Sequence, residues 1–207
     1  FVLSAPLAAQ EVVVTDCSSD ADLRAKMDDI EAQGSGTIKI ACATSPGTIL
    51  LNGTALPTIH ANMTIIGNGV TISGNNNTTI FTVESDGALT VYGSNLTRAV
   101  AASDGGAIAS VGALTIVDSQ IYDNKSLAGN GGAIWASGPL TIRNSYFSGN
   151  SAVNGGAIYA YAGATVSIRR SNFTGNQTAD SVNYGGALYL TDGSHSVAES
   201  VFIQNLS

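Results

Sequence analysis

An internal repeat occupies the second half of this 207-residue chain and limits the folds that the chain can adopt. Gly-Gly-Ala-Ile occurs at 105–108, 131–134 and 155–158, and Gly-Gly-Ala-Leu follows at 185–188. The intervals between these tetrapeptides are 26, 24 and 30 residues. Self-similarity at such a period is typical of solenoids, in which each repeat is one structural unit that stacks on the next.

A second pattern lies between the Gly-Gly pairs. Leu114-Thr-Ile aligns with Leu140-Thr-Ile and Val166-Ser-Ile, and each is followed by an aromatic or Ile position and then by Asn. His195-Ser-Val is a degenerate fourth copy. Alternating β-branched residues that are separated by Gly, Asn and Ser favour short strands and tight turns and oppose a helix. We therefore expect an all-β solenoid of about six or seven coils with a spacing of about 4.8 Å.

Stacking of equivalent positions predicts which side chains face the core. One expected inward column consists of Ile108, Ile134, Ile158 and Leu188, and another of Ile121, Phe147, Phe173 and Phe202. The recurring asparagines are expected at a turn, because Asn tolerates a left-handed backbone and its amide can bond to the Asn in the next coil. This expected asparagine ladder comprises Asn124, Asn150, Asn176 and Asn205. The Gly-Gly pairs are expected at another sharp turn, where a positive φ is needed.

One amphipathic helix is expected near the N-terminus, from about Asp20 to Ala32. Leu23, Met27 and Ile30 share one face of it, and acidic residues lie in its first turn. An open solenoid end exposes core and unpaired strand edges, and a helix across that end covers both. We divide the chain into an apolar N-terminal arm at 1–15, a capping-helix region at 16–36 and a β-helix at 37–207.

The apolar arm allows two interpretations. Its residues change from apolar to small before the polar Gln10, as they do at the end of a secretory signal. The arm also lacks a basic segment and an initiator Met, so we favour an arm that belongs to the mature fold.

Cys17 and Cys42 are the two cysteines of the chain. They do not form a CxxC motif, and no other metal-ligand types cluster with them. We favour a disulfide over two free buried thiols. A disulfide would place the protein in an oxidising compartment outside the cytosol.

The composition excludes several classes of partner. Eight Lys and Arg residues stand against fifteen Asp and Glu residues, which gives a net charge of −7. So few scattered cations do not suit the phosphate backbone of a nucleic acid. No apolar run reaches the roughly 18 residues of a membrane-spanning helix. Neither a phosphate-binding nor a dinucleotide-binding motif appears, so we expect no cofactor.

The titratable residues give little support for catalysis. Enzymes with parallel β-helices cut polysaccharides with clustered carboxylates. Here Asp118 is replaced at equivalent positions by Asn144 and Arg170, and no Asp-Asp or Asp-x-Asp pair occurs in the solenoid. His60 and His195 belong to different coils. We expect no catalytic residue and no metal site.

An aromatic column is the most suggestive surface feature. If the Ile positions of the repeat face inward, alternation turns Trp135, Tyr159 and Tyr189 outward on one face. Such a ladder suits stacking against sugars or burial in a protein interface. The alternative is packing between coils, or a face covered by a loop, and the residues leave both open.

The repeat resembles that of a known family. Gly-Gly-Ala-Ile combined with Phe-x-x-Asn is similar to the repeat of bacterial polymorphic outer-membrane proteins. The stretch from Asp16 to Gly74 resembles the N-terminal part of secreted right-handed parallel β-helix repeat proteins, with Asp-Leu-Arg, Gly-Thr-Ile and Thr-Ile-Ile-Gly-Asn-Gly. The resemblance covers nearly all of the chain after residue 15. It implies a right-handed parallel β-helix at the cell surface or outside the cell, and it implies little about activity.

The two ends of the chain predict how it associates. The last coil leaves apolar residues and free strand edges unprotected, which is a template for another chain. The residues expected in a subunit contact are Phe1, Val2, Leu3, Val201, Phe202, Ile203 and Leu206. We expect a non-catalytic, structural or adhesive solenoid whose partner is itself, in a head-to-tail filament, or a cell-surface protein or glycan. The alternatives are a carbohydrate-binding or carbohydrate-cleaving β-helix, and a piece of a longer surface protein whose further coils cover the end.

Overall fold

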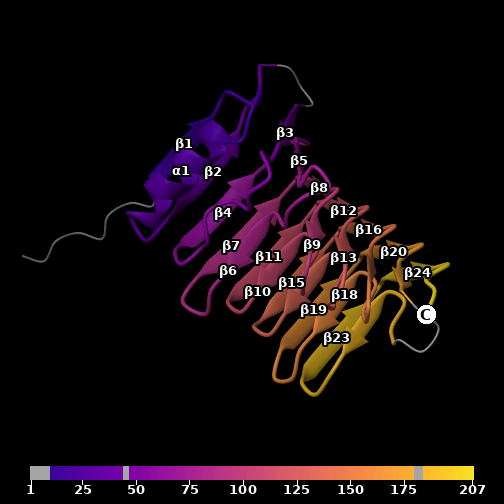
Figure 1. Ribbon diagram of the computed structural model, residues 1–207. Coiled ribbons are helices and arrows are strands. Elements are labelled where there is room, and N and C mark those ends of the chain that lie inside the picture. Colours follow the sequence, from indigo (N-terminus) through magenta and orange to yellow (C-terminus); the bar gives the residue numbers. More distant parts are fainter. Residues whose placement is uncertain (1–9, 44–46, 180–183) are drawn as a thin grey trace, which may run out of the picture.

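Short strands with alternating burial build a rod of stacked coils. The computed structural model describes residues 10–43, 47–179 and 184–207 (Figure 1). Its strands fall into four parallel sheets, here named A to D, and each strand pairs with the equivalent strand of a neighbouring coil. The coils follow one another along the rod in sequence order and make about seven turns, as the repeat predicts.

Sheets A and B run along most of the rod. Sheet A consists of β1 (Gln10–Val14), β2 (Ser35–Ile40), β4 (Asn62–Ile66), β7 (Ala88–Tyr92), β11 (Ala113–Val117), β15 (Leu140–Arg143), β19 (Thr165–Arg169) and β23 (Ser194–Ala198). Sheet B consists of β3 (Thr48–Leu50), β5 (Thr71–Ser73), β8 (Asn95–Thr97), β12 (Gln120–Tyr122), β16 (Tyr146–Ser148), β20 (Asn172–Thr174) and β24 (Val201–Ile203).

Sheets C and D complete the coils from residue 81 onward. Sheet C consists of β6 (Phe81–Val83), β10 (Ile108–Ser110), β14 (Ile134–Ala136), β18 (Ile158–Ala160) and β22 (Leu188–Leu190). Sheet D consists of β9 (Val100–Ala101), β13 (Lys125–Ser126), β17 (Ser151–Ala152) and β21 (Gln177–Thr178).

The core lies inside the coils and is built from columns of identical residue types. Ile108, Ile134 and Ile158 are register partners in sheet C, and all three are fully buried. In sheet B the ring of Phe173 stacks on that of Phe147 at a centroid distance of 4.9 Å and on that of Phe202 at 4.8 Å. The ring spacing equals the coil spacing, so flat rings fill the column without gaps.

The recurring asparagines form a buried chain of amide hydrogen bonds, here called the inner ladder. The Asn124 amide donates to Oδ1 of Asn150 at 3.0 Å, and the Asn150 amide donates to Oδ1 of Asn176 at 2.9 Å. Asn176 bonds to Asn205 in the same way. The prediction that these asparagines adopt a left-handed backbone is wrong by one position. The positive φ belongs to the preceding residue of each coil, for example 54° at Asp123.

A column of serines adds a second ladder at the turn between sheets A and B. The backbone N–H of Ser119 donates to the hydroxyl of Ser145 at 3.2 Å, and the same bond joins Ser145 to Ser171. The Ser119 hydroxyl in turn donates to the carbonyl of Val117. The hydroxyls therefore satisfy buried backbone groups that the turn leaves without a strand partner.

The Gly-Gly pairs serve two different needs. The first glycine of each pair has a positive φ, for example 67° at Gly131, as expected for a sharp turn. A Cβ on the second glycine, Gly132, would collide with the carbonyl oxygen of Gly156 in the next coil. The first glycine thus shapes the turn, and the second allows neighbouring coils to approach closely.

Helix α1 (Ala21–Glu31) covers the core at the N-terminal end of the rod (Figure 1). Its Leu23, Met27 and Ile30 are fully buried, as the periodicity predicts. A disulfide joins Cys17 to Cys42, with the two Cα atoms 5.5 Å apart, and ties the segment before the helix to the segment after β2.

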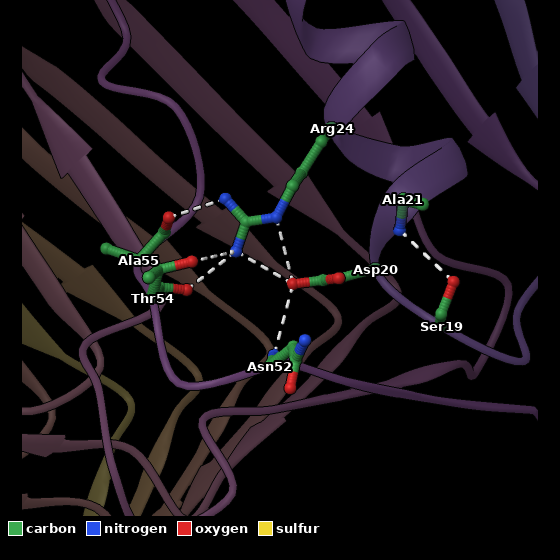
Figure 2. Close-up of polar contacts among 7 residues, drawn as sticks. All are labelled: Ser19, Asp20, Ala21, Arg24, Asn52, Thr54 and Ala55. Atoms are coloured by element: carbon green, nitrogen blue, oxygen red, sulfur yellow. Dashed lines mark hydrogen bonds and ion pairs between the residues drawn. The ribbon is translucent and has the colours of Figure 1, made fainter.

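Asp20 occupies the N-cap position of α1, but its carboxylate does not cap the helix. It binds the guanidinium of Arg24 at 2.7 and 2.9 Å and accepts the backbone N–H of Asn52 (Figure 2). Arg24 also donates to the carbonyl oxygens of Thr54 and Ala55. Burial raises the pKa of Asp20, but the hydrogen bonds from Arg24 and Asn52 outweigh burial and hold this pKa below its ordinary value. The carboxylate therefore links the cap to the first coils.

Part of the expected N-terminal arm belongs to the solenoid. Residues 10–14 form β1, which pairs in parallel with β2 and adds a further strand to sheet A. Val14 enters the buried core column beside Ile40, so these residues of the arm pack as part of the β-helix. Phe1, Val2 and Leu3 lie outside the described residues.

Candidate functional site

The aromatic column lies on the outward side of sheet C. Trp135 and Tyr159 are register partners, and Tyr159 pairs in the same way with Tyr189. All three side chains are half-buried, whereas Ile134 and Ala136 on either side of Trp135 are buried. Alternation along each strand therefore places the rings outward, in one line along the rod.

Two further tyrosines extend this column to a patch. The rings of Tyr159 and Tyr189 have centroids 5.2 Å apart, and the ring of Tyr184 lies 5.8 Å from that of Tyr189. The Tyr161 ring lies 6.2 Å from that of Trp135. Tyr161 and Tyr184 are the most exposed members, with 52% and 64% of their surface accessible. We call these five residues the aromatic face.

Sequence reasoning missed Tyr161 and Tyr184, although both have a repeat position. Tyr184 directly precedes Gly-Gly, where other coils carry Asp104, Asn130 or Asn154. Tyr161 follows β18 directly, outside the strand alternation that indicated the other aromatic residues. Alignment of the residue before each Gly-Gly pair is the signal that would have indicated Tyr184.

The residues before the Gly-Gly pairs form a polar chain beside the aromatic face, here called the outer ladder. Oδ1 of Asp104 accepts the backbone N–H and the amide of Asn130 at 2.7 and 3.1 Å. Asn154 donates to Oδ1 of Asn130 at 2.9 Å, and Oδ1 of Asn154 accepts the backbone N–H of Tyr184. The outer ladder therefore runs along the rod in the same direction as the aromatic column.

The two features share one electrostatic environment. The pKa of Tyr159 lies above its ordinary value, first because the hydroxyl is partly buried and then because Tyr189, Tyr161 and Asp104 lie nearby. Because the ordinary tyrosine pKa of about 10 already lies well above 7, this phenol is protonated at neutral pH and can both donate and accept a hydrogen bond. The aromatic face and Asp104 thus form one polar and aromatic surface.

The last coil is a second candidate surface, here called the end face. Phe202 is 43% exposed and Val197 is 42% exposed, although their register partners Phe173 and Ile168 in the preceding coil are buried. β24 and β23 are the last strands of their sheets, so within the described chain one edge of each has no strand partner.

The residues expected in a subunit contact differ in where they point. Phe202 continues the inward column of phenylalanines, whereas Val201 and Ile203 flank it on the outward side of β24. Leu206 is exposed, and it bridges in parallel to Gln177 beside sheet D. The end face therefore exposes core side chains and outward apolar side chains together.

Several charged residues pair within the chain. Arg169 binds Glu199 at 2.6 Å, and the Asn144 amide donates to Asp118 at 3.1 Å. His60 lies 2.9 Å from Asp86, and this hydrogen bond raises the pKa of the exposed imidazole above its ordinary value. Asp118 thus takes part in a surface hydrogen bond between coils.

Among the described residues, neither a cluster of metal ligands nor a membrane-spanning helix occurs. Within 10–43, 47–179 and 184–207, no three His, Cys, Asp or Glu side chains gather where they could hold a metal ion. No helix in that part of the chain has the length and apolar character needed to cross a membrane.

Comparison with known proteins identifies the repeat. The family described as the Chlamydia polymorphic membrane protein (Chlamydia_PMP) repeat matches residues 144–161. This segment contains Phe147 of the phenylalanine column, Asn150 of the inner ladder and the Gly-Gly-Ala-Ile at 155–158. Searches of curated proteins and of solved structures find no significant match. The chain is a parallel β-helix repeat protein whose repeat is like that of the Chlamydia polymorphic membrane proteins.

Proposed function

We propose that the protein is a non-catalytic structural β-helix at the cell surface or outside the cell, and that it joins further copies end to end. The observation that carries this proposal is the end face, where Phe202 and Val197 continue buried columns yet are more than two-fifths exposed. Exposed core side chains beside free strand edges favour the addition of another coil, which either a second copy or further residues of a longer protein would supply.

The geometry of sheet A supports a head-to-tail contact. β1 is the first strand of this sheet and β23 is the last, and all its pairings are parallel. A second copy with its β1 beside β23 continues the sheet in the same direction. Such a contact uses two different surfaces, does not close on itself and produces a filament. Phe1, Val2 and Leu3 remain predicted members of this contact.

The location outside the cytosol rests on two supports. The Cys17–Cys42 disulfide favours an oxidising compartment, because thiols stay reduced in the cytosol. The matching repeat is named for membrane proteins. An adhesive role requires a ligand-binding surface, for which the aromatic face is the candidate.

Light scattering at increasing concentration tests the end-to-end contact. We expect the mass of the native chain to rise with concentration from 20.9 kDa, the mass of a monomer. The double substitution Val197→Lys and Phe202→Lys should leave a monomer, because the contact would bury two charges that have no partner. Tyr146→Lys is the control, since Tyr146 is also exposed, at 54%, but lies on the outward side of sheet B.

Two results would contradict the proposal. A native chain that stays monomeric at micromolar concentration has no end-to-end contact. Association that survives in the double variant, or that is lost equally in the Tyr146→Lys control, would show that the end face is not the contact surface.

A further inference from the structure

The aromatic face has the properties of a binding surface that is independent of the rod ends. We infer that it binds a neutral polysaccharide, with the glycan chain lying along the rod. Trp135, Tyr159 and Tyr189 occupy equivalent positions in successive coils, so they present one ring per coil in a straight line. A linear polymer is the ligand whose repeating units match such a line.

The rings are accessible to a ligand. Tyr161 and Tyr184 are more than half exposed and flank the central column. Aromatic side chains of this kind stack on the apolar faces of flat partners and keep their hydroxyls free for hydrogen bonds. Pyranose rings have an apolar C–H face and hydroxyl groups at the edge, so they fit both properties of these side chains.

The outer ladder supplies polar partners for sugar hydroxyls. Both hydrogen bonds from Asn130 to Asp104 end on Oδ1, which leaves Oδ2 as an acceptor with no partner among the described residues. The amides of Asn130 and Asn154 each use one N–H in the ladder. A few fixed polar groups beside a largely aromatic surface are typical of ligand sites.

Charge selects a neutral glycan rather than an acidic one. The aromatic face carries no cation, its nearest charged neighbour on the outer ladder is Asp104, and the chain has a net charge of −7. A uronic-acid or sulfated polymer would be repelled. The outward positions around the rings, such as Ala109, Ser137 and Thr191, are small or polar, which favours a sugar over the apolar core of a protein partner.

Trp135 provides a direct measurement, because it is the one tryptophan of the chain. We would titrate the native protein with cellohexaose, xylohexaose and chitohexaose, and with hexagalacturonic acid as the acidic comparison. The expected result is a saturable change in tryptophan emission with at least one neutral oligosaccharide and none with the acidic one.

The variants locate the binding surface. Tyr161→Ser with Tyr184→Ser should weaken binding by about tenfold or more, since exposed aromatic anchors carry much of such an interaction. Tyr146→Ser, which removes an equally exposed tyrosine from sheet B, should leave the titration unchanged. Unchanged circular dichroism and melting temperature confirm that both variants fold.

Several results would overturn the inference. These are the absence of any response to the three neutral sugars, an equal response to hexagalacturonic acid, or equal losses in the Tyr146→Ser control. Capture of a protein partner through these tyrosines without a response to the sugars would also contradict it. The Val197→Lys and Phe202→Lys variant should still bind, so failure of the end-to-end contact and failure of this site are distinguishable.

Discussion

Replacing Asn150 with alanine is expected to lower the free energy of unfolding by about 2 to 4 kcal/mol. The side chain of Asn150 is fully buried and makes four hydrogen bonds. Its oxygen accepts from the backbone and the amide of Asn124, and its own amide donates to Ile121 and Asn176. Alanine leaves these buried groups short of partners, and each unpaired group costs about 1 to 3 kcal/mol.

Urea-induced unfolding measures this loss, and Asn62→Ala is the control. Asn62 is an exposed residue of β4, so its replacement should change the free energy of unfolding by less than about 0.5 kcal/mol. Equal effects of the two substitutions would contradict the account of the inner ladder.

Replacing Phe147 with alanine is expected to cost about 3 to 5 kcal/mol. The ring is fully buried and stacks on Phe173, so its removal leaves a cavity that rigid neighbouring coils cannot fill. Phe202→Ala removes the same ring at the exposed end of the same column and should cost about 1 kcal/mol in the monomer. Denaturant unfolding at a concentration where the chain is monomeric compares the two, and equal losses would show that this column is not the core.

The coils could be predicted from the sequence because each repeat places the same residue types at the same core and turn positions. Ile134 and its equivalents are apolar because they form one inward column. Their spacing in the sequence gives the register of the strands directly. The capping helix was likewise visible from the spacing of Leu23, Met27 and Ile30. These features depend on patterns within one segment or between identical segments.

The features that sequence reasoning missed depend on contacts with residues outside the repeat pattern. β1 carries no repeat motif, and it is a strand because β2 offers it an edge. Asp20 occupies the N-cap position of α1, but its carboxylate binds Arg24 and Asn52, which the helix pattern does not indicate. Tyr161 and Tyr184 lie outside the strand alternation, so only the fold brings them to the aromatic column.

Spin-label distances along sheet A measure directly whether successive repeats stack as parallel coils. Lys39 and Arg143 lie in one register column, and the column continues to Arg169 and Ala198. One label is placed on Lys39 and the second on Arg143, Arg169 or Ala198. The labels are attached without cysteine chemistry, so that the disulfide stays intact. The three pairs are separated by four, five and six coil spacings.

At about 4.8 Å per spacing, the expected backbone separations are about 19, 24 and 29 Å. The last two steps should be equal, although Arg169 follows Arg143 by 26 residues and Ala198 follows Arg169 by 29. Equal steps would show that each repeat is one coil in parallel register. Separations that do not rise from one pair to the next, or that follow residue number instead of coil number, would contradict the solenoid.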